Sequence, residues 1–300
     1  MAVLQAERVE TRRKHIGSSE VAALFGLDPR KTLFELWHQK AGNLPDEDPL
    51  DSERVFWGTV LEPAISQGIA EREGWKVRKV RRYIAHPGVA GLGASLDYEI
   101  YGHPRGAAPL EIKNVDWLVA KDWPDGLPPL RFELQVQHQL ACLPSRAWAA
   151  LGVLIGGNSL KVFQYERHPA AIAKIERAVA DFWDSIADRR PPEPDFERDL
   201  HVLETLYDKA DAGSVKDLRG NPRLAELCAR YERARGDEAN AERRKRQIKA
   251  AIMALIQETE TVFCDGFKIL APERPGGEVS YRRKPYRDFR VQPYGVREEE

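Results

Sequence analysis

The chain has 300 residues, of which 42% are hydrophobic, which suffices for one large globular domain or for a core with an appended region. Its 46 Lys and Arg residues nearly balance 47 Asp and Glu residues, so bulk charge indicates no polyanionic partner and a nucleic-acid site must come from local clustering. Three separated cysteines, Cys142, Cys228 and Cys264, exclude a disulfide framework and a four-cysteine metal site. The charged N-terminus and the lack of a long apolar stretch predict a cytoplasmic protein with no membrane contact.

The first two thirds of the chain alternate between helical and strand-like hydrophobic patterns. In chain order, the patterns predict helices at 18–25, 32–40 and 52–72, strands at 77–85, 93–100 and 109–115, a helix at 131–141, strands at 148–155 and 160–165, and a helix at 169–187. This order predicts an α/β fold with a mixed central sheet whose faces are covered by helices.

A proline-rich segment at 189–194 cannot continue a helix, so we place the end of the core at residue 195 and treat 196–300 as an extension. Within the extension, 222–257 predicts a long projecting helix, and 262–270 predicts a β-hairpin with its turn at Asp265 and Gly266. The tail at 281–291 interleaves aromatic residues with arginine. That pattern is typical of a surface that follows single-stranded nucleic acid and equally of a solvated edge strand protected by charge. No catalytic role is assigned to the extension.

Two carboxylates and an amine are predicted to converge on neighbouring strands. Asp97 lies in the strand at 93–100, and Glu111 and Lys113 lie two residues apart in the next strand, so both point to the same face. A bare Asp…Glu-x-Lys pattern is weak evidence, because chance produces it in many charged chains. Here Leu110 and Ile112 flank Glu111 as they would in a buried strand, and burying such charges without a cation would cost several kcal/mol.

These residue types suit phosphodiester hydrolysis with a divalent metal. Asp97, Glu111 and the backbone carbonyl of Ile112 supply the oxygen ligands that Mg²⁺ prefers. A cation held there can lower the pKa of a water molecule and stabilise the leaving oxygen. Lys113 would orient the water or offset charge on the phosphate.

Five short motifs occur in a fixed order between Arg12 and about Asp188. They are 12–20 (RRKHIGSSE), 56–62 (FWGTVLE), 95–97 (SLD), 110–113 (LEIK) and 135–137 (QVQ). Together they resemble the lambda-exonuclease and YqaJ-type viral recombinase family of phage alkaline exonucleases, which have the PD-(D/E)XK restriction-endonuclease-like fold. Leu96 replaces the common proline before Asp97, and Tyr98 replaces the common glycine after it, so the turn can differ although no charge is lost.

The resemblance implies roles for further residues. Arg12 and Ser19 would hold the 5′-phosphate of a DNA end, and Ser95 would contact a phosphate. Glu62 would be an accessory acidic residue that reaches the metal through water, and Gln135 would contact the site.

Other readings of these residues remain open. Arg12 lies in a basic run, where Arg13 or Lys14 could replace it, and Ser19 could also cap a helix. Glu62 would be an ordinary surface residue, unless Trp57 and Leu61 partly bury it. His138 is taken as structural and is left out of the metal site.

The resemblance also implies an activity. The family digests one strand of linear double-stranded DNA from its 5′ end, with Mg²⁺ or Mn²⁺, and leaves a 3′ overhang for a single-strand annealing protein in recombination. Members form homo-oligomers such as a ring of three subunits, and they act as phage or prophage proteins in the bacterial cytoplasm. Two alternatives stay open: an endonuclease of the restriction or repair type on the same fold, and a non-catalytic module that binds DNA ends.

Overall fold

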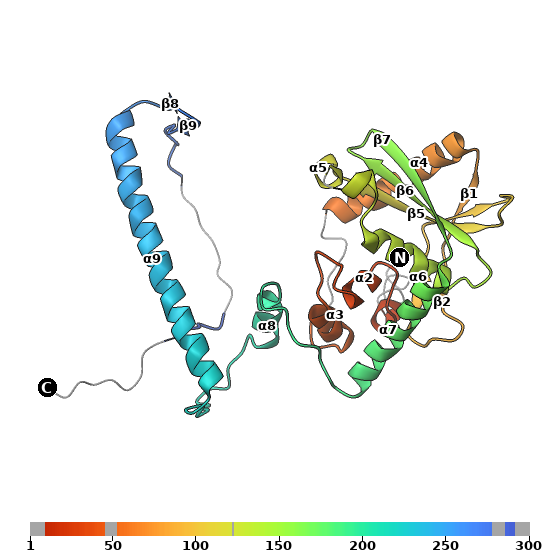
Figure 1. The fold of residues 1–300 in the computed structure, drawn as a ribbon, viewed down its shortest axis with the longest axis horizontal. Helices are drawn as coiled ribbons and strands as arrows, with labels where there is room; N and C mark the ends of the chain where they lie inside the picture. The colour runs from red at the N-terminus through yellow and green to blue at the C-terminus, as the bar shows by residue number, and fades with distance from the viewer. Residues whose placement is uncertain (1–9, 46–52, 122, 278–285, 292–300) are drawn as a thin grey trace. The chain divides into compact units, whose positions relative to one another are not determined.

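The computed structural model describes residues 10–45, 53–121, 123–277 and 286–291 (Figure 1). The chain divides into two compact units, Met1–Leu206 and Tyr207–Glu300. The first unit thus continues beyond residue 195, where the sequence predicted the end of the core. Among the described residues, none of the helices is both long enough and apolar enough to span a bilayer.

The first unit is built on a five-stranded mixed sheet with the strand order β1–β4–β5–β6–β7. Its parallel pair is β5 with β6, and the other neighbours are antiparallel. The parallel pair is joined through a helix, α6 (Leu130–Ala141), because parallel strands need a crossover connection. The expected mixed sheet with flanking helices is confirmed. The strands are β1 (Lys76–Lys79), β4 (Tyr98–Tyr101), β5 (Ala108–Val115), β6 (Trp148–Ile155) and β7 (Ser159–Glu166).

Helices cover both faces of this sheet (Figure 1). On one face α4 (Glu53–Glu73) packs against β5 and β6. On the other face α6 packs against the sheet together with α7 (Pro169–Ala187), and α2 (Val21–Leu24) and α3 (Leu33–Lys40) complete that layer. Because side chains alternate along a strand, Leu110 and Ile112 of β5 enter the core beneath α4, whereas Glu111 points towards α6.

The strands expected at 77–85 and 93–100 are each divided in two, which corrects the sequence analysis. β2 (Tyr83–Ala85) and β3 (Gly93–Ser95) pair with each other in a small separate sheet. The chain passes from this small sheet into the large one at Leu96 and Asp97, where the N–H of Val80 donates to the Asp97 carbonyl oxygen. A period-two hydrophobic pattern does not reveal where a strand changes its partner.

The helix expected at 18–25 is also shorter than predicted. α2 has only four residues, its N-cap is Glu20, and no side chain caps it, so the predicted serine cap is wrong. The Glu20 side chain instead accepts a hydrogen bond from the N–H of Gly17. The helices expected at 32–40, 52–72, 131–141 and 169–187 are confirmed, and two short helices, α5 (Trp117–Ala120) and α8 (Leu200–Leu206), were not predicted.

The second unit consists of a long helix and a hairpin. α9 (Pro222–Ile256) begins at Asn221, whose side chain accepts a hydrogen bond from the N–H of Leu224. β8 (Thr261–Cys264) and β9 (Phe267–Leu270) form the predicted hairpin, with Gly266 at a φ of +78° in its turn. In the predicted tail strand, 281–285 lie outside the described residues, and 286–291 form no regular structure.

Candidate active site

Asp97 and Glu111 reach the same side of the sheet from neighbouring strands. Asp97 directly precedes β4, and Tyr98 pairs with Leu110 in antiparallel register, so one further step places Asp97 opposite Glu111. Residues directly opposed in an antiparallel pair point to one face, with Cβ atoms about 5 Å apart. Oδ2 of Asp97 also accepts a hydrogen bond of 2.9 Å from the backbone N–H of Ile112. The two carboxylates therefore share one site.

Glu111 is buried and is held by three donors. Its side chain is 4% exposed. Oε1 accepts hydrogen bonds of 2.5 Å from Nζ of Lys113 and from Nε2 of Gln135, and Oε2 accepts one of 2.5 Å from Nε2 of Gln139. Both glutamines come from α6, so the helix that joins the parallel strands also fixes the carboxylate. Donors on both oxygens stabilise a buried carboxylate that would otherwise be costly.

The charged groups at this site shift one another's pKa values. Burial, followed by the negative charge of Glu111, raises the pKa of Asp97 to about 8, although Lys113 and the hydrogen bond from Ile112 act in the opposite direction. Burial alone would lower the pKa of Lys113, but the charges of Glu111 and Asp97 outweigh it and raise that pKa above its usual value. Lys113 therefore stays a cation throughout the neutral range.

Glu62 approaches the site from α4. Its charge is a further, smaller cause of the raised pKa of Asp97, and its carboxylate forms an ion pair with Lys79 of β1. The Glu62 side chain is 18% exposed, but Trp57, which was expected to help bury it, is itself half exposed. Pro63 follows directly and removes one backbone N–H donor from the middle of α4.

The donor set at this site fits a hard divalent cation. Mg²⁺ typically binds through one or two carboxylates, with water completing an octahedron. Asp97 and Glu111 supply those carboxylates. Their repulsion, which adds to burial in raising the pKa of Asp97, is what a cation between them would relieve. Within the described ranges, no three His, Cys, Asp or Glu side chains are grouped so that they could hold a metal. Glu62 therefore does not join the other two as a direct third side-chain ligand in this geometry.

The three residues expected at a DNA 5′-phosphate are all exposed. Arg12 lies in a helical segment at 10–14, Ser19 in the turn before α2, and Ser95 at the end of β3. In the part of the chain that the structure describes, no hydrogen bond or ion pair joins these side chains to Asp97 or Glu111. Their exposure leaves them accessible to a ligand, but contacts within the protein do not hold them beside the two carboxylates.

Three residues near the site were missed by the sequence analysis. Gln139 donates to Glu111, and its spacing of four residues from Gln135 could have revealed it, because such residues share a helix face. The charge of Arg30 acts on both Lys113 and Arg131, and the Lys113 and Arg131 side chains both lie over the ring of Phe132. Nothing in the sequence around Arg30, in a loop before α3, indicated this proximity.

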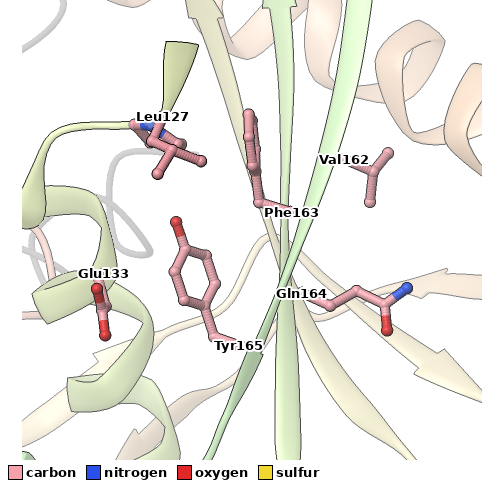
Figure 2. A pocket seen from close by; sticks show the side chains of 7 residues that line it. Leu127, Glu133, Val162, Phe163, Gln164 and Tyr165 are labelled. Atoms are coloured by element: carbon pink, nitrogen blue, oxygen red, sulfur yellow. The ribbon is translucent and has the colours of Figure 1, made fainter. Parts of the chain in front are cut away.

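A separate hollow lies between α6 and β7 (Figure 2). Glu133 and Tyr165 line it, and burial, followed by the charge of Glu133, raises the pKa of Tyr165 to about 12. Asp97, Glu111 and Lys113 are not among its lining residues, so it is not part of the carboxylate site. The complete lining is Leu127, Pro128, Glu133, Val162, Phe163, Gln164 and Tyr165.

Comparison with known proteins confirms the resemblance that the motifs indicated. Residues 8–146 match the model of the YqaJ-like viral recombinase domain, a range that includes the carboxylates, Lys113 and both glutamines. The chain is 36% identical over 173 residues to YqaJ of Bacillus subtilis (strain 168), a protein described as uncharacterized. That match covers 57% of this chain and 53% of YqaJ, so the chain spans about half the length of this relative.

Two solved structures resemble this chain more distantly. One is an alkaline exonuclease, LHK-Exo, from Laribacter hongkongensis, with 23% identity and a TM-score of 0.46, covering 63% of this chain and 94% of that protein. The other is LHK-Exo in complex with dAMP, with 23% identity and a TM-score of 0.47, covering 64% of this chain and 97% of that protein.

Proposed function

We propose that this chain, whose residues 8–146 match the YqaJ-like viral recombinase domain, is a metal-dependent deoxyribonuclease that digests linear double-stranded DNA from its 5′ ends. The observation that carries the proposal is the joining of Asp97, Glu111 and Lys113 in one half-buried site. The proposed product is a duplex with a 3′ single-stranded overhang.

Each side chain of the site has a different proposed role in hydrolysis. Asp97 and Glu111 would hold Mg²⁺, or Mn²⁺ in its place, with the carbonyl of Ile112 as a further ligand. The bound cation would supply Lewis-acid stabilisation of the phosphate and a water of lowered pKa. Lys113 keeps its positive charge beside the scissile phosphate, where it offsets negative charge that develops during the reaction. Gln135 and Gln139 keep Glu111 in position.

A preference for 5′ ends is proposed from the exposed residues at the N-terminal side of the site. Arg12 and Ser19 would hold the terminal phosphate, and Ser95 would contact the same strand. Arg30, whose charge acts on Lys113, and Arg131, which lies over the same Phe132 ring as Lys113, add positive charge along which a DNA backbone could lie. Phosphate contacts of this kind position DNA without reading its sequence, which suits an enzyme that digests any duplex end.

The biological setting is proposed from the family match. A 3′ overhang is the substrate of a single-strand annealing protein, so we propose such a protein as the partner in phage-type recombination in the bacterial cytoplasm. A homo-oligomer, for example a ring of three subunits, would keep the enzyme on one DNA molecule through many cycles.

The test uses linear duplex DNA labelled at either the 5′ or the 3′ end of one strand. The full-length protein is incubated with this DNA, with Mg²⁺ or with a chelator, and in parallel with nicked and with supercoiled circles. We expect Mg²⁺-dependent release of mononucleotides, early loss of the 5′ label, and late loss of the 3′ label.

Each alternative gives a different result. Cutting of supercoiled circles would replace the proposal with an endonuclease. Tight binding of ends without hydrolysis in Mg²⁺ or Mn²⁺ would replace it with a non-catalytic end-binding module. Early loss of the 3′ label would reverse the polarity and remove the role proposed for Arg12 and Ser19.

A further inference from the structure

α9 carries apolar side chains with the seven-residue spacing of a coiled coil. When Leu224 is taken as the first position of a heptad, the first and fourth positions along the helix hold mainly apolar residues. Only Glu238 and Lys245, near the middle, depart from the pattern. The apolar members of this seam are Leu224, Leu227, Tyr231, Ala234, Ala241, Ile248, Ile252 and Leu255.

The seam is exposed in the structure. All eight of its apolar residues are in the exposed class, and Leu255 is 84% exposed, whereas Ile256, outside the seam, is the buried residue of α9. Within the described residues, one ring contact involves the seam: the ring centroids of Phe289 and Tyr231 are 5.6 Å apart. A long helix gains most of its stability from packing an apolar face, so this seam requires a partner.

One antiparallel register matches the seam to itself. If two α9 helices lie antiparallel with Leu224 opposite Leu255, the ends of the seam pair apolar residues with apolar residues. In the middle, each long polar side chain meets a small one. The layers, each between one helix and the other, are Leu224 with Leu255, Leu227 with Ile252, Tyr231 with Ile248, Ala234 with Lys245, and Glu238 with Ala241.

The charges beside the seam favour the same register. In an antiparallel pair, a residue that flanks the seam faces a residue at the same heptad position of the other helix. Arg235 then faces Glu242 of the other copy, and Asp237 faces Arg244. The two-fold symmetry repeats both attractive pairs. Such pairs add little affinity, but they select orientation and partner.

A parallel, in-register pair would instead bring like charges together. Glu238 would face Glu238, and Lys245 would face Lys245, within the seam. At its flanks Arg230 would meet Arg235, and Asp237 would meet Glu242. The sequence therefore disfavours the parallel arrangement at each of these contacts.

We propose that α9 is a self-association helix, which pairs antiparallel with α9 of a second copy of this chain. This contact links two copies through their second units and is separate from a ring formed by the first units. This inference does not depend on the proposed nuclease activity, because it follows from the second unit alone. The partner must present a matching apolar seam and opposite charges beside it. A second α9 that runs in the opposite direction meets both requirements.

The orientation can be tested by spin labels on the outer face of the helix. In full-length protein with Cys228→Ser and Cys264→Ser, a label is placed at Ala229→Cys in one sample and at Asn240→Cys in another, and distances within the dimer are measured by pulsed electron resonance. With a helical rise of about 1.5 Å per residue, the antiparallel register separates the two labels at position 229 by about 30 Å along the axis. It leaves the two labels at position 240 side by side, and similar short distances at both positions would overturn the proposal.

Charge reversal provides a second test, read out as molar mass by light scattering across a concentration series. Arg235→Glu should weaken the dimer by up to about tenfold, because two attractive pairs become two repulsive pairs. Adding Glu242→Arg should restore the dimer. The matched control is Arg233→Glu, which makes the same charge change on the outer face and should leave the dimer intact.

The other outcomes of the mass measurement are also decisive. In a parallel dimer, Arg235→Glu would relieve the repulsion from Arg230 and strengthen association. A monomer at every concentration, or an oligomer that all three charge variants leave unchanged, would overturn the proposal. DNA digestion by the variants is measured only to show that the first unit is intact.

Discussion

The two units of this chain use buried and exposed residues in opposite ways. In the first unit, polar groups that would be costly to bury are buried and receive partners from the same chain, as Glu111 does from Lys113, Gln135 and Gln139. In the second unit, apolar side chains that would gain from burial are exposed along α9. The first unit buries its polar site within its own fold, whereas the second unit does not bury the apolar seam of α9 within its own fold.

This difference predicts that the first unit determines hydrolysis and that α9 determines oligomerisation. Changes in the first unit should alter hydrolysis or the stability of its core while the mass of the particle stays constant. Changes in the seam of α9 should alter the mass while leaving the chemistry of each site intact. The following predictions test that separation.

Lys113→Ala should have the largest effect on hydrolysis, a loss of about a thousandfold or more, because it removes the cation beside the phosphate. Because this variant also removes the ion pair with Glu111, Lys113→Gln is measured beside it, since the amide can still donate to that carboxylate. Both variants should be inactive and keep the parental mass. Lys161→Ala, on β7 two strands away in the same sheet, is the control and should be fully active. Near-normal turnover in Lys113→Gln would refute the mechanism.

Ending the chain at residue 195 should destabilise the first unit more than ending it at residue 206. Asp199 is buried, accepts a hydrogen bond of 2.6 Å from the Thr32 hydroxyl, and accepts another from the N–H of Asp195. Val202 is also buried. Losing these groups should lower the free energy of unfolding by about 2–4 kcal/mol. Urea titration of both truncated proteins measures the difference, and equal stability would place the boundary at residue 195.

Acid should destabilise the first unit through His138. Burial lowers the pKa of His138 to about 4, and its Nε2 donates to the Gly93 carbonyl. Between pH 6.5 and 4 the unfolded chain therefore binds a proton that the folded chain does not, so stability falls by about 1.4 kcal/mol per pH unit as pH decreases.

His138→Gln removes this titration, and its free energy of unfolding should depend less steeply on pH over that window than that of the parent. The raised pKa of Asp97 acts in the opposite sense in both proteins, because a folded state that holds the extra proton gains stability as pH falls. The difference between variant and parent therefore isolates His138. Identical slopes in the two proteins would show that the histidine is not buried as a neutral ring.

Gln139→Ala should reduce kcat by about tenfold, with little change in KM, because Glu111 loses its donor at Oε2 and is held less firmly. Titration of Mg²⁺ should show weaker activation, which a purely structural role would not produce. Gln139→Glu, which replaces the donor with an acid, should be more severe. Unchanged Mg²⁺ dependence in both variants would exclude this positioning role.

Arg12→Ala should have the smallest effect, a slowing of several-fold that appears on 5′-phosphorylated ends and hardly on 5′-hydroxyl ends. The side chain is exposed and has no carboxylate partner in the site, so its loss should not disturb the fold. The dependence of binding on salt should also decrease, because fewer counterions are released. Equal slowing on both kinds of end would argue against a phosphate pocket at Arg12.

The sequence predicted the main elements around the carboxylates well, for a physical reason. β5, α6 and α7 have long, regular hydrophobic patterns, and the two-residue spacing of Glu111 and Lys113 requires a shared face whatever the neighbours are. The order of the motifs then located Gln135 on the helix that covers that face. These features depend on residues that are close together in the chain, so they can be predicted from the sequence.

Features that depend on distant partners were not predictable. The break between β3 and β4 at Asp97 arises because the two strands pair with different sheets, and no local residue signals that change. Arg30 comes near Lys113 only through the packing of the loop before α3. The exposure of Trp57 likewise depends on what surrounds the start of α4, which its own hydrophobicity cannot reveal.

Because Asp97 lies between two sheets, the pair of carboxylates is complete only when both sheets have formed. The carboxylate meets Glu111 only when β4 has paired with β5, after the chain has left the small hairpin of β2 and β3. Because the proposed function needs both carboxylates, a chain that has not yet paired β4 with β5 would be unable to hydrolyse DNA.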